Sequence, residues 1–294
     1  ASRSSHRLVH HVAWRRRRLA VKWRSVVFSH PDADRALWVC SWQRSGSTWL
    51  AEILSQAPRT RLIYEPANVL DNIITGEESA AVELPRHSQR HARRVARAFE
   101  GIVKGPWVDQ FNATHFPTRH VVKDVRAMGI LGDVAELSPE TPIIVLLRHP
   151  FDVARSALRL GWRDANLSDE DAFVHEVTTW CELHDDALRD PRSSRALWVT
   201  YEDLTGDNAG ASFQSVLIYL TTYHPTWRVL TSTRLNATQR SQTDFSGEGR
   251  SIDLPDSWRE RGAAILAHYG FDRLYSSAGD QVASTAEFLA QRPR

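Results

Sequence analysis

The sequence predicts an α/β fold, in which a mostly parallel sheet is flanked by helices on both faces. Short apolar runs alternate along the chain with longer segments of helical periodicity. The clearest apolar run is residues 142–147, and an unbroken run of this length is typical of a strand buried on both faces. Strands that alternate with helices form parallel sheets, because each crossover helix returns the chain to the same edge. The 294 residues suffice for one large α/β domain or two small ones.

The composition excludes several classes of protein. The content of 42% hydrophobic and 24% charged residues is typical of an ordinary globular protein. The net charge of +2 is too small to indicate nucleic-acid binding. No apolar run approaches 18 residues, so we expect no membrane-spanning segment. Two cysteines, Cys40 and Cys181, imply no disulfide framework. Only three of the 37 basic residues are lysine, a bias that favours a GC-rich genome and therefore a bacterial, cytoplasmic protein.

Residues 1–34 form a basic N-terminal segment with four consecutive arginines at 15–18. Two interpretations stay open. The favoured one is an arginine-rich amphipathic helix that covers the domain, and the alternative is a patch that contacts an anionic surface, including the periphery of a membrane. We expect the α/β domain to span residues 35–278 and residues 279–294 to form a C-terminal tail. The oligomeric state cannot be read from the sequence.

The first strand, at residues 37–40, leads directly into a helix through a turn of small residues, 43–48, with one glycine and one cation. Such a turn aims free backbone N–H groups and the positive end of the helix dipole at one point, which favours anion binding. The hydroxyl groups of Ser45, Ser47 and Thr48 and the charge of Arg44 add further donors. The turn is therefore predicted to be a phosphate-binding loop.

The remaining elements are expected in a regular order. They are a strand at 61–66, a basic helix at 91–103, a strand at 120–124, a helix at 128–137, the strand at 142–147, helices at 150–160 and 168–189, a strand at 196–200, and helices at 212–223 and 258–269. Pro150 suits a first helical turn, and Ser168 with Asp171 forms an N-capping pattern. Residues 71–118 carry the weakest pattern, and we expect them to cover the substrate.

A second candidate phosphate site follows the strand at 142–147. There Arg148, Pro150 and Ser156 form the pattern R-x-P-x5-S. A guanidinium fork matches phosphate oxygens, and a hydroxyl two helical turns later supplies one more donor. We expect this site to hold a second phosphate about a nucleotide's width from the first loop.

The phosphate loop is not a Walker A motif, G-x-x-x-x-G-K-[ST], because it lacks the lysine and because Gln43 and Arg44 stand in the glycine-rich half. A P-loop-like nucleotide kinase is one alternative function, but it would also need an acidic metal ligand at a strand end, and none is evident. The other is a non-catalytic protein that binds glycans or anionic surfaces through residues 15–18 and the basic helix.

Together the two phosphate motifs resemble those of sulfotransferases that use 3′-phosphoadenylyl sulfate (PAPS). The stretch from Arg44 to Trp49, R-S-G-S-T-W, is similar to the R-S-G-S-[ST] loop of the carbohydrate branch, and R-x-P-x5-S is the family's 3′-phosphate motif. Y-E-D-L at residues 201–204, the E-P pair at 65–66 and K-x-x-R at 123–126 are also similar, the last two to the carbohydrate branch. The resemblance covers residues 38–269 and implies a P-loop-like sulfotransferase fold.

The resemblance also implies which residues bind PAPS and its product 3′,5′-adenosine bisphosphate (PAP), without a metal. They are Arg44, Ser45, Gly46, Ser47, Thr48, Trp49, Arg148, Ser156, Tyr201, Gly249 and Arg250. Trp49 and Tyr201 are expected near the adenine. Gly249 and Arg250 lie in a late loop expected to fold over the 3′-phosphate, although Arg250 is followed by Ser251 and the family's usual basic-glycine pair is missing.

The expected reaction is in-line transfer of a sulfuryl group to a hydroxyl. Glu65 is the expected base, since it lies at the carboxyl edge of a strand, where open α/β sheets bind ligands. Arg44 is expected to stabilise the leaving phosphate, with Lys123 as a second cation. The cytosolic branch has a catalytic histidine where this chain has Val125, so a histidine base of that type is missing. His115 and His120 stay open as alternatives to Glu65.

The acceptor is expected to be a carbohydrate, a glycolipid, or a glycosylated or secondary metabolite. Three of the 11 tryptophans, Trp107, Trp162 and Trp227, are candidates for the walls of its site.

Overall fold

The structure is a computed structural model. It describes residues 35–67, 89–105, 107–112, 117–162, 164–207, 209–230 and 253–292. The basic N-terminal segment, His115 and the late loop with Gly249 and Arg250 lie outside the described residues.

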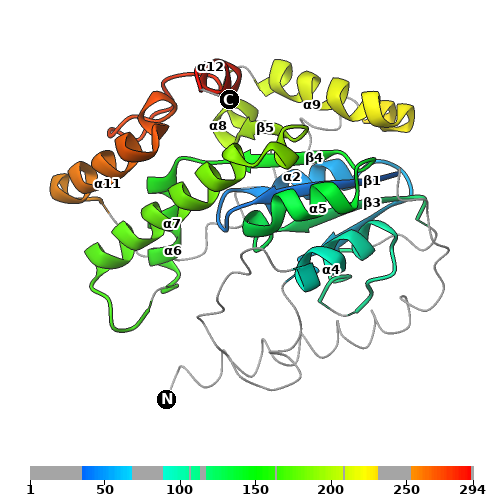
Figure 1. Cartoon of the computed structure of the whole chain (residues 1–294), viewed down its shortest axis with the longest axis horizontal. Helices are drawn as coiled ribbons and strands as arrows, with labels where there is room; N and C mark the ends of the chain where they lie inside the picture. The colour runs from blue at the N-terminus through cyan, green and yellow to red at the C-terminus, as the bar shows by residue number, and fades with distance from the viewer. Residues whose placement is uncertain are drawn as a thin grey trace.

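A five-stranded parallel sheet in the order β2-β3-β1-β4-β5 forms the centre of the molecule (Figure 1). The strands are β1 (Ala36–Ser41), β2 (Thr60–Tyr64), β3 (Arg119–Asp124), β4 (Ile143–Leu147) and β5 (Leu197–Thr200). The chain adds β2 and β3 on one side of β1, and β4 and β5 on the other. The side of the sheet on which strands are added thus reverses at β1. Where the strand order reverses in this way, a crevice is left at the carboxyl ends of the central strands, and ligands bind there.

The predicted helices occur in the predicted order. The helices are α2 (Ser47–Ser55), α4 (Gln89–Phe99), α5 (Leu131–Leu137), α6 (Pro150–Arg159), α7 (Asp169–Arg189), α8 (Tyr201–Thr205), α9 (Ala209–Tyr223), α11 (Asp256–Tyr269) and α12 (Thr285–Ala290). Of these, α8 and α12 are two helices that the sequence analysis did not predict. Pro150 is the first residue of α6, and the Ser168 side chain caps α7 by accepting from the Asp171 N–H. Both local predictions are confirmed.

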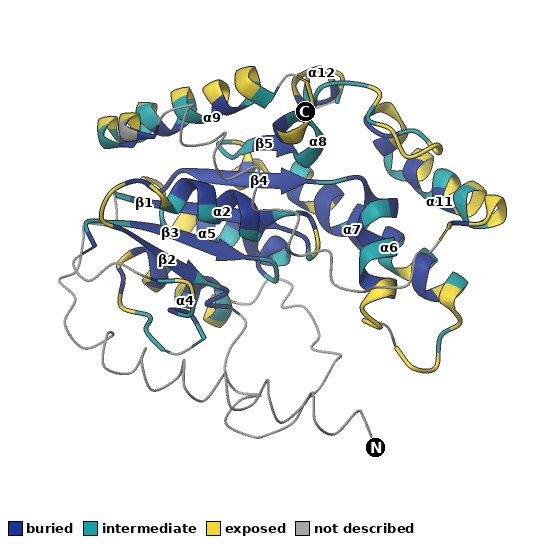
Figure 2. Ribbon diagram, turned by 180° about the vertical axis from the view of Figure 1, so that it is seen from behind, coloured by how far each residue is buried: buried dark blue, intermediate teal, exposed yellow. Residues whose placement is uncertain are grey.

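Alternate residues of β1 enter two different hydrophobic clusters, and all six residues of the strand are buried. Trp38 and Cys40 pack with residues of α4, α5 and α7, whereas Leu37 and Val39 pack with residues of α2 and α9. Figure 2 shows the central strands buried along their length between these layers. Burial on both faces explains the unbroken apolar run in the sequence, and the predicted fold class is confirmed.

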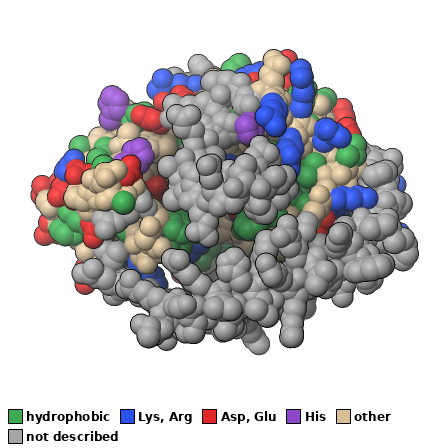
Figure 3. Space-filling model, turned by 90° about the horizontal axis from the view of Figure 1, so that it is seen from below, with side chains coloured by type: hydrophobic (Ala, Val, Ile, Leu, Met, Phe, Trp, Pro, Cys, Tyr) green, Lys and Arg blue, Asp and Glu red, His purple; other side chains and the backbone are tan. Residues whose placement is uncertain are grey.

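The basic helix α4 covers the β2 and β3 side of the sheet with an apolar stripe that includes Val95 and Phe99. The sequence predicted this helix to reach residue 103, but it ends at Phe99. Gly101 follows in a left-handed conformation (φ 72°), which terminates a helix. Ile102, which lies within the predicted helix, is exposed. Figure 3 shows Lys and Arg side chains gathered on the side of the molecule that carries α4.

The segment after residue 278 contains α12. Its Phe288 is buried in the larger cluster and stacks on Phe271, with ring centroids 5.5 Å apart. Thr285, the first residue of α12, donates a hydrogen bond to Asp203, 3.1 Å away. These contacts attach the segment to the end of β5, while the predicted division of the chain into domains stays a prediction.

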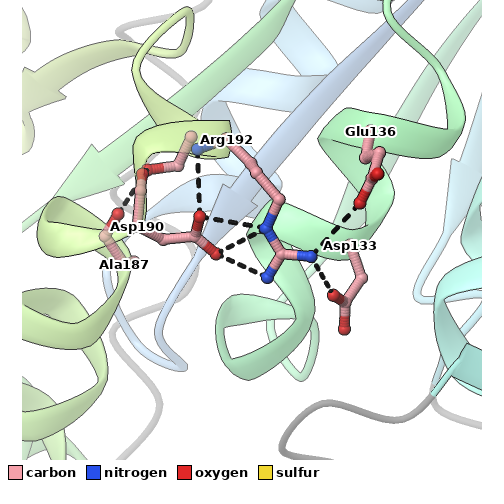
Figure 4. A network of polar contacts seen from close by, with 6 residues as sticks. Asp133, Glu136, Ala187, Asp190 and Arg192 are labelled. Atoms are coloured by element: carbon pink, nitrogen blue, oxygen red, sulfur yellow. Dashed lines mark hydrogen bonds and ion pairs between the residues drawn. The ribbon is translucent and has the colours of Figure 1, made fainter.

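A surface network centred on Arg192 joins α5 to the end of α7 (Figure 4). The guanidinium contacts Asp190 at 2.8 Å, Asp133 at 2.6 Å and Glu136 at 3.3 Å. A Cβ at Gly132 would lie 1.9 Å from the Asp190 carboxylate, so a larger residue there would displace the Asp190 side chain. The network fixes the helices on one face of the sheet and lies away from the crevice.

Candidate active site

A cavity of about 650 Å³ opens at the carboxyl ends of the strands. Its walls come from the segments that end or follow all five strands, including Arg44 after β1, Glu65 after β2, Arg126 after β3, Arg148 after β4 and Tyr201 after β5. Segments far apart in the sequence meet there because parallel strands end at one edge of the sheet. Polar groups converging on a single hollow of this size are typical of a ligand site.

The predicted phosphate loop forms the floor of this cavity. Gly46 precedes α2 in a left-handed conformation (φ 89°, ψ 8°), so the chain turns from β1 straight into the helix. A Cβ at this position would lie 2.6 Å from the Tyr201 ring, which makes glycine necessary for a second reason. Gly46, Ser47, Thr48 and Trp49 all line the cavity, and the N-terminus of α2 therefore faces it.

Two polar atoms of the predicted phosphate motifs are buried without a partner among the described residues. They are the Ser45 hydroxyl and the Arg148 Nε. Leaving such groups unsatisfied costs about 1–3 kcal/mol each, which a ligand with oxygen acceptors would remove. A hydroxyl and a guanidinium are suitable donors for phosphate oxygens. The residues present therefore fit a ligand with phosphate groups.

The two phosphate motifs are in direct contact. The Arg44 Nε donates to the Ser156 hydroxyl at 2.9 Å, and an Arg148 Nη donates to the Arg44 carbonyl at 3.2 Å. The Arg148 guanidinium also lies over the Tyr201 ring, 4.7 Å from its centroid. The long Arg44 side chain thus spans the gap between the two motifs. Burial, and then the charge of Arg148, lower the pKa of Arg44, and an anion between these cations would relieve both effects.

Glu65 and Lys123 form a buried ion pair at the cavity wall. The Glu65 Oε1 lies 2.5 Å from the Lys123 Nζ, and the side chains are 9% and 3% exposed. Glu65 adopts a left-handed backbone conformation (φ 45°), as does Arg44 (φ 61°). Non-glycine residues adopt this conformation at a cost of about 1–2 kcal/mol, and such strain clusters at functional sites.

Tyr64 is a site residue that the sequence analysis missed. Its ring centroid lies 4.4 Å from the Lys123 Nζ, and Thr48 and Glu65 are both near enough to its phenol to affect the pKa of Tyr64. Burial, and then the charge of Glu65, raise the pKa of Tyr64 well above its usual value, so the phenol keeps its proton. Tyr64 therefore links the phosphate loop to the ion pair. The available signal was an aromatic residue at the last position of a strand, directly before Glu65.

Two further rings pack on Tyr64 and line the cavity. The centroid of Trp107 lies 5.5 Å from that of Tyr64, and the centroid of Phe111 lies 4.9 Å away. We call Tyr64, Trp107 and Phe111 the aromatic wall. Trp162 lines the cavity near Arg44, with the guanidinium 5.4 Å from its ring. Trp227, the third tryptophan considered, is instead fully buried in the core on the α2 side.

The other predicted residues divide between the cavity and the core. Trp49 lines the cavity and also packs edge-on against Tyr201, with centroids 5.6 Å apart. His120 pairs with Ala36 at the opposite end of β3 from the cavity, where its Nδ1 lies 3.0 Å from the Phe99 carbonyl. His120 is therefore outside the cavity, and its assignment as an alternative base has no geometric support.

The sulfotransferase family model matches residues 37–214, more than half of the chain. The chain therefore belongs to the sulfotransferase family, whose members transfer sulfuryl groups. The match does not select the carbohydrate branch. No curated protein sequence matches the chain, and no helix among the described residues is long and apolar enough to span a membrane.

Several solved sulfotransferase structures are similar to this chain. The sulfotransferase domain of the Synechococcus PCC 7002 olefin synthase is 19% identical, with 83% of this chain and 96% of that chain covered and a TM-score of 0.44. Sulfotransferase STF9 from Mycobacterium avium is 12% identical, with 81% and 76% covered and a TM-score of 0.47. Mouse sulfotransferase SULT7A1, complexed with PAP, is 13% identical, with 85% and 88% covered and a TM-score of 0.46.

Proposed function

We propose that this protein is a PAPS-dependent O-sulfotransferase, which transfers a sulfuryl group to an acceptor hydroxyl and releases PAP. One observation carries the proposal. The phosphate loop and the Arg148 motif touch one another in the same cavity that holds the ion pair of Glu65 and Lys123. Family membership supports the sulfuryl chemistry.

In this proposal the chain's own donors bind the nucleotide. The backbone N–H groups after Gly46 and the hydroxyls of Ser45, Ser47 and Thr48 bind the 5′-phosphosulfate, and the unpaired Ser45 hydroxyl supports this assignment. Arg148 and Ser156 bind the 3′-phosphate. Gly249 and Arg250 complete that site, and Trp49 and Tyr201 lie against the adenine.

The proposed reaction is a single displacement at sulfur. The acceptor oxygen forms a bond to sulfur while the bond from sulfur to the bridging phosphate oxygen breaks, and that oxygen keeps the electron pair. Glu65 accepts the hydroxyl proton, and Arg44 with the loop N–H groups stabilises the charge that develops on the leaving phosphate. As Glu65 becomes neutral, Lys123 loses its counter-charge, so its ammonium can stabilise the same developing charge.

The acceptor in this proposal is a carbohydrate or secondary metabolite. The aromatic wall supports this choice, since such rings stack on the apolar face of a sugar or on another ring. A cytoplasmic, bacterial setting stays a prediction from composition.

Calorimetric titration of PAP into the metal-free protein tests the nucleotide half of the proposal. We expect micromolar binding, and the Arg148→Ala variant should bind at least about tenfold more weakly, since a hydrogen-bonded charge contributes about 1.5–3 kcal/mol. Arg261→Ala is the matched control, because Arg261 pairs with Glu170 on the surface, outside the cavity. Absence of PAP binding would refute the proposal. Binding of ATP with magnesium instead would favour a kinase.

A further inference from the structure

Four cationic side chains line the cavity, and three of them have a partner in the described part of the chain. Arg44 donates to Ser156, Arg148 donates to the Arg44 carbonyl, and Lys123 pairs with Glu65. The Arg126 guanidinium makes no hydrogen bond or ion pair with a described residue, and its backbone N–H donates to the Asp124 Oδ1 at 2.8 Å. Among the described residues, Arg126 is therefore the cavity cation whose side chain has no polar partner.

Arg126 stands apart from the phosphate motifs. It follows β3, whose neighbours are β2 and β1, whereas Arg148 follows β4 on the far side of β1. The strand β2 ends in Tyr64, the centre of the aromatic wall. Arg126 thus follows the strand that lies between β1, which leads into the phosphate loop, and β2, which ends in the aromatic wall, and it lines the same cavity as Glu65 and Lys123.

The exposure of Arg126 also favours a ligand. The side chain is half-buried at the cavity wall, where a guanidinium is partly removed from water. Its planar fork matches a carboxylate, phosphate or sulfate with two parallel hydrogen bonds, and the lower dielectric strengthens such a pair. Among the residues that the structure describes, two acidic side chains share the cavity: Glu65, which Lys123 neutralises, and Glu52, which belongs to α2.

We infer that the acceptor is an anionic, ring-containing alcohol or phenol. Its flat face packs on the aromatic wall, its acidic group binds Arg126, and its hydroxyl points to Glu65. This inference rests on the proposed function and narrows the acceptor of the same site. Arg126 is a specificity-determining residue in this arrangement, since it selects acceptors by charge and takes no part in the displacement itself.

Matched probes that differ by one charge test the inference on the PAP-saturated protein. One pair is para-hydroxymethylbenzoate and its neutral amide, and the other is methyl glucuronide and methyl glucoside. In calorimetric titrations, the charged member of at least one pair should bind about tenfold more tightly, as one charged hydrogen-bonded contact predicts. Arg126→Gln should abolish the difference, and Arg126→Lys should retain part of it. Arg261→Gln, on the surface, should leave it unchanged.

The outcomes separate this inference from the proposed function. PAP affinity is measured first in every variant, and unchanged affinity in Arg126→Gln shows that the nucleotide site is intact. If PAP binds and neither charged probe binds more tightly than its neutral partner, the acceptor inference is wrong while the proposed function stands. A preference for the charged probe that persists in Arg126→Gln would also overturn the acceptor inference. If PAP itself does not bind, the proposed function fails first.

Discussion

Replacing Glu65 with glutamine tests the proposed base and the buried ion pair together. Glutamine has nearly the same shape but no charge, so it removes the proton acceptor and leaves the Lys123 ammonium without its counter-ion. That ammonium is 3% exposed and 2.5 Å from the carboxylate. The variant is thus expected to lose both turnover and stability.

The structure sets the size of each effect. Removing one partner of a buried ion pair costs about 3–5 kcal/mol, because the remaining charge stays buried. The Tyr64 ring, 4.4 Å from the Lys123 Nζ, makes the same cation–π contact with the ammonium before and after the substitution, so it leaves this difference unchanged. We therefore expect a loss of about 3–5 kcal/mol in the free energy of unfolding. Turnover should fall by about 10²–10⁴, the usual contribution of a general base, and PAP affinity should change little.

Urea unfolding, PAP calorimetry and turnover with PAPS measure these three quantities. Adding Lys123→Met to Glu65→Gln removes the stranded charge, so the double variant should be more stable than the single one. Asp185→Asn is the control, because the buried Asp185 pairs with the half-buried Arg292 at 2.7 Å and with Arg189 at 2.9 Å, away from the cavity. This variant should lose stability and keep its turnover per folded molecule. Equal destabilisation of the single and double variants would refute the ion-pair reasoning. Undiminished turnover would remove Glu65 as the base.

Three further predictions each concern a single residue. Gly46→Ala places a Cβ 2.6 Å from the Tyr201 ring in a left-handed backbone, so calorimetry should show PAP affinity at least about tenfold lower. Tyr64→Phe removes the phenol, which interacts with Thr48 and Glu65, but keeps the ring, so turnover should fall about tenfold at unchanged PAP affinity. Burial lowers the pKa of His184 to about 4, below its value in the unfolded chain. Stability should therefore decline as the pH falls from about 6.5 to 4, by up to about 3 kcal/mol, and His184→Gln should flatten this decline in urea unfolding.

Each of these predictions has a control within the chain. Gly210, where a Cβ would meet nothing within 4 Å, serves as the neutral glycine-to-alanine site. Tyr64→Leu, which also removes the ring over Lys123, should be less active than Tyr64→Phe, and equal activity would contradict the role of the ring. Burial raises the pKa of Asp124 to about 6, so Asp124 destabilises the fold as pH rises. Asp124 is present in both the wild type and His184→Gln, so its opposite effect cancels when the two are compared. If the pH dependence of stability were the same in both, the assignment to His184 would be wrong.

The sequence determined the layered fold and the phosphate loop because both are recorded in contiguous residues. Burial on both faces appears as the unbroken apolar run of β4, and the loop is a local backbone turn whose small residues and glycine stand side by side. The R-x-P-x5-S pattern was equally local, since strand, turn and helix place Arg148 and Ser156 without help from distant segments.

Tertiary structure alone decided how the cavity is lined. Glu65 and Lys123 are 58 residues apart in the chain, and only the pairing of β2 with β3 brings their side chains together. The aromatic wall draws Trp107 and Phe111 from a segment without a periodic pattern, so the sequence could not show that they pack on Tyr64. Whether Arg126 has a partner also depends on every neighbour that folding places around it. Sequence patterns record local conformation and burial, whereas pairing between side chains depends on the sheet order that folding creates.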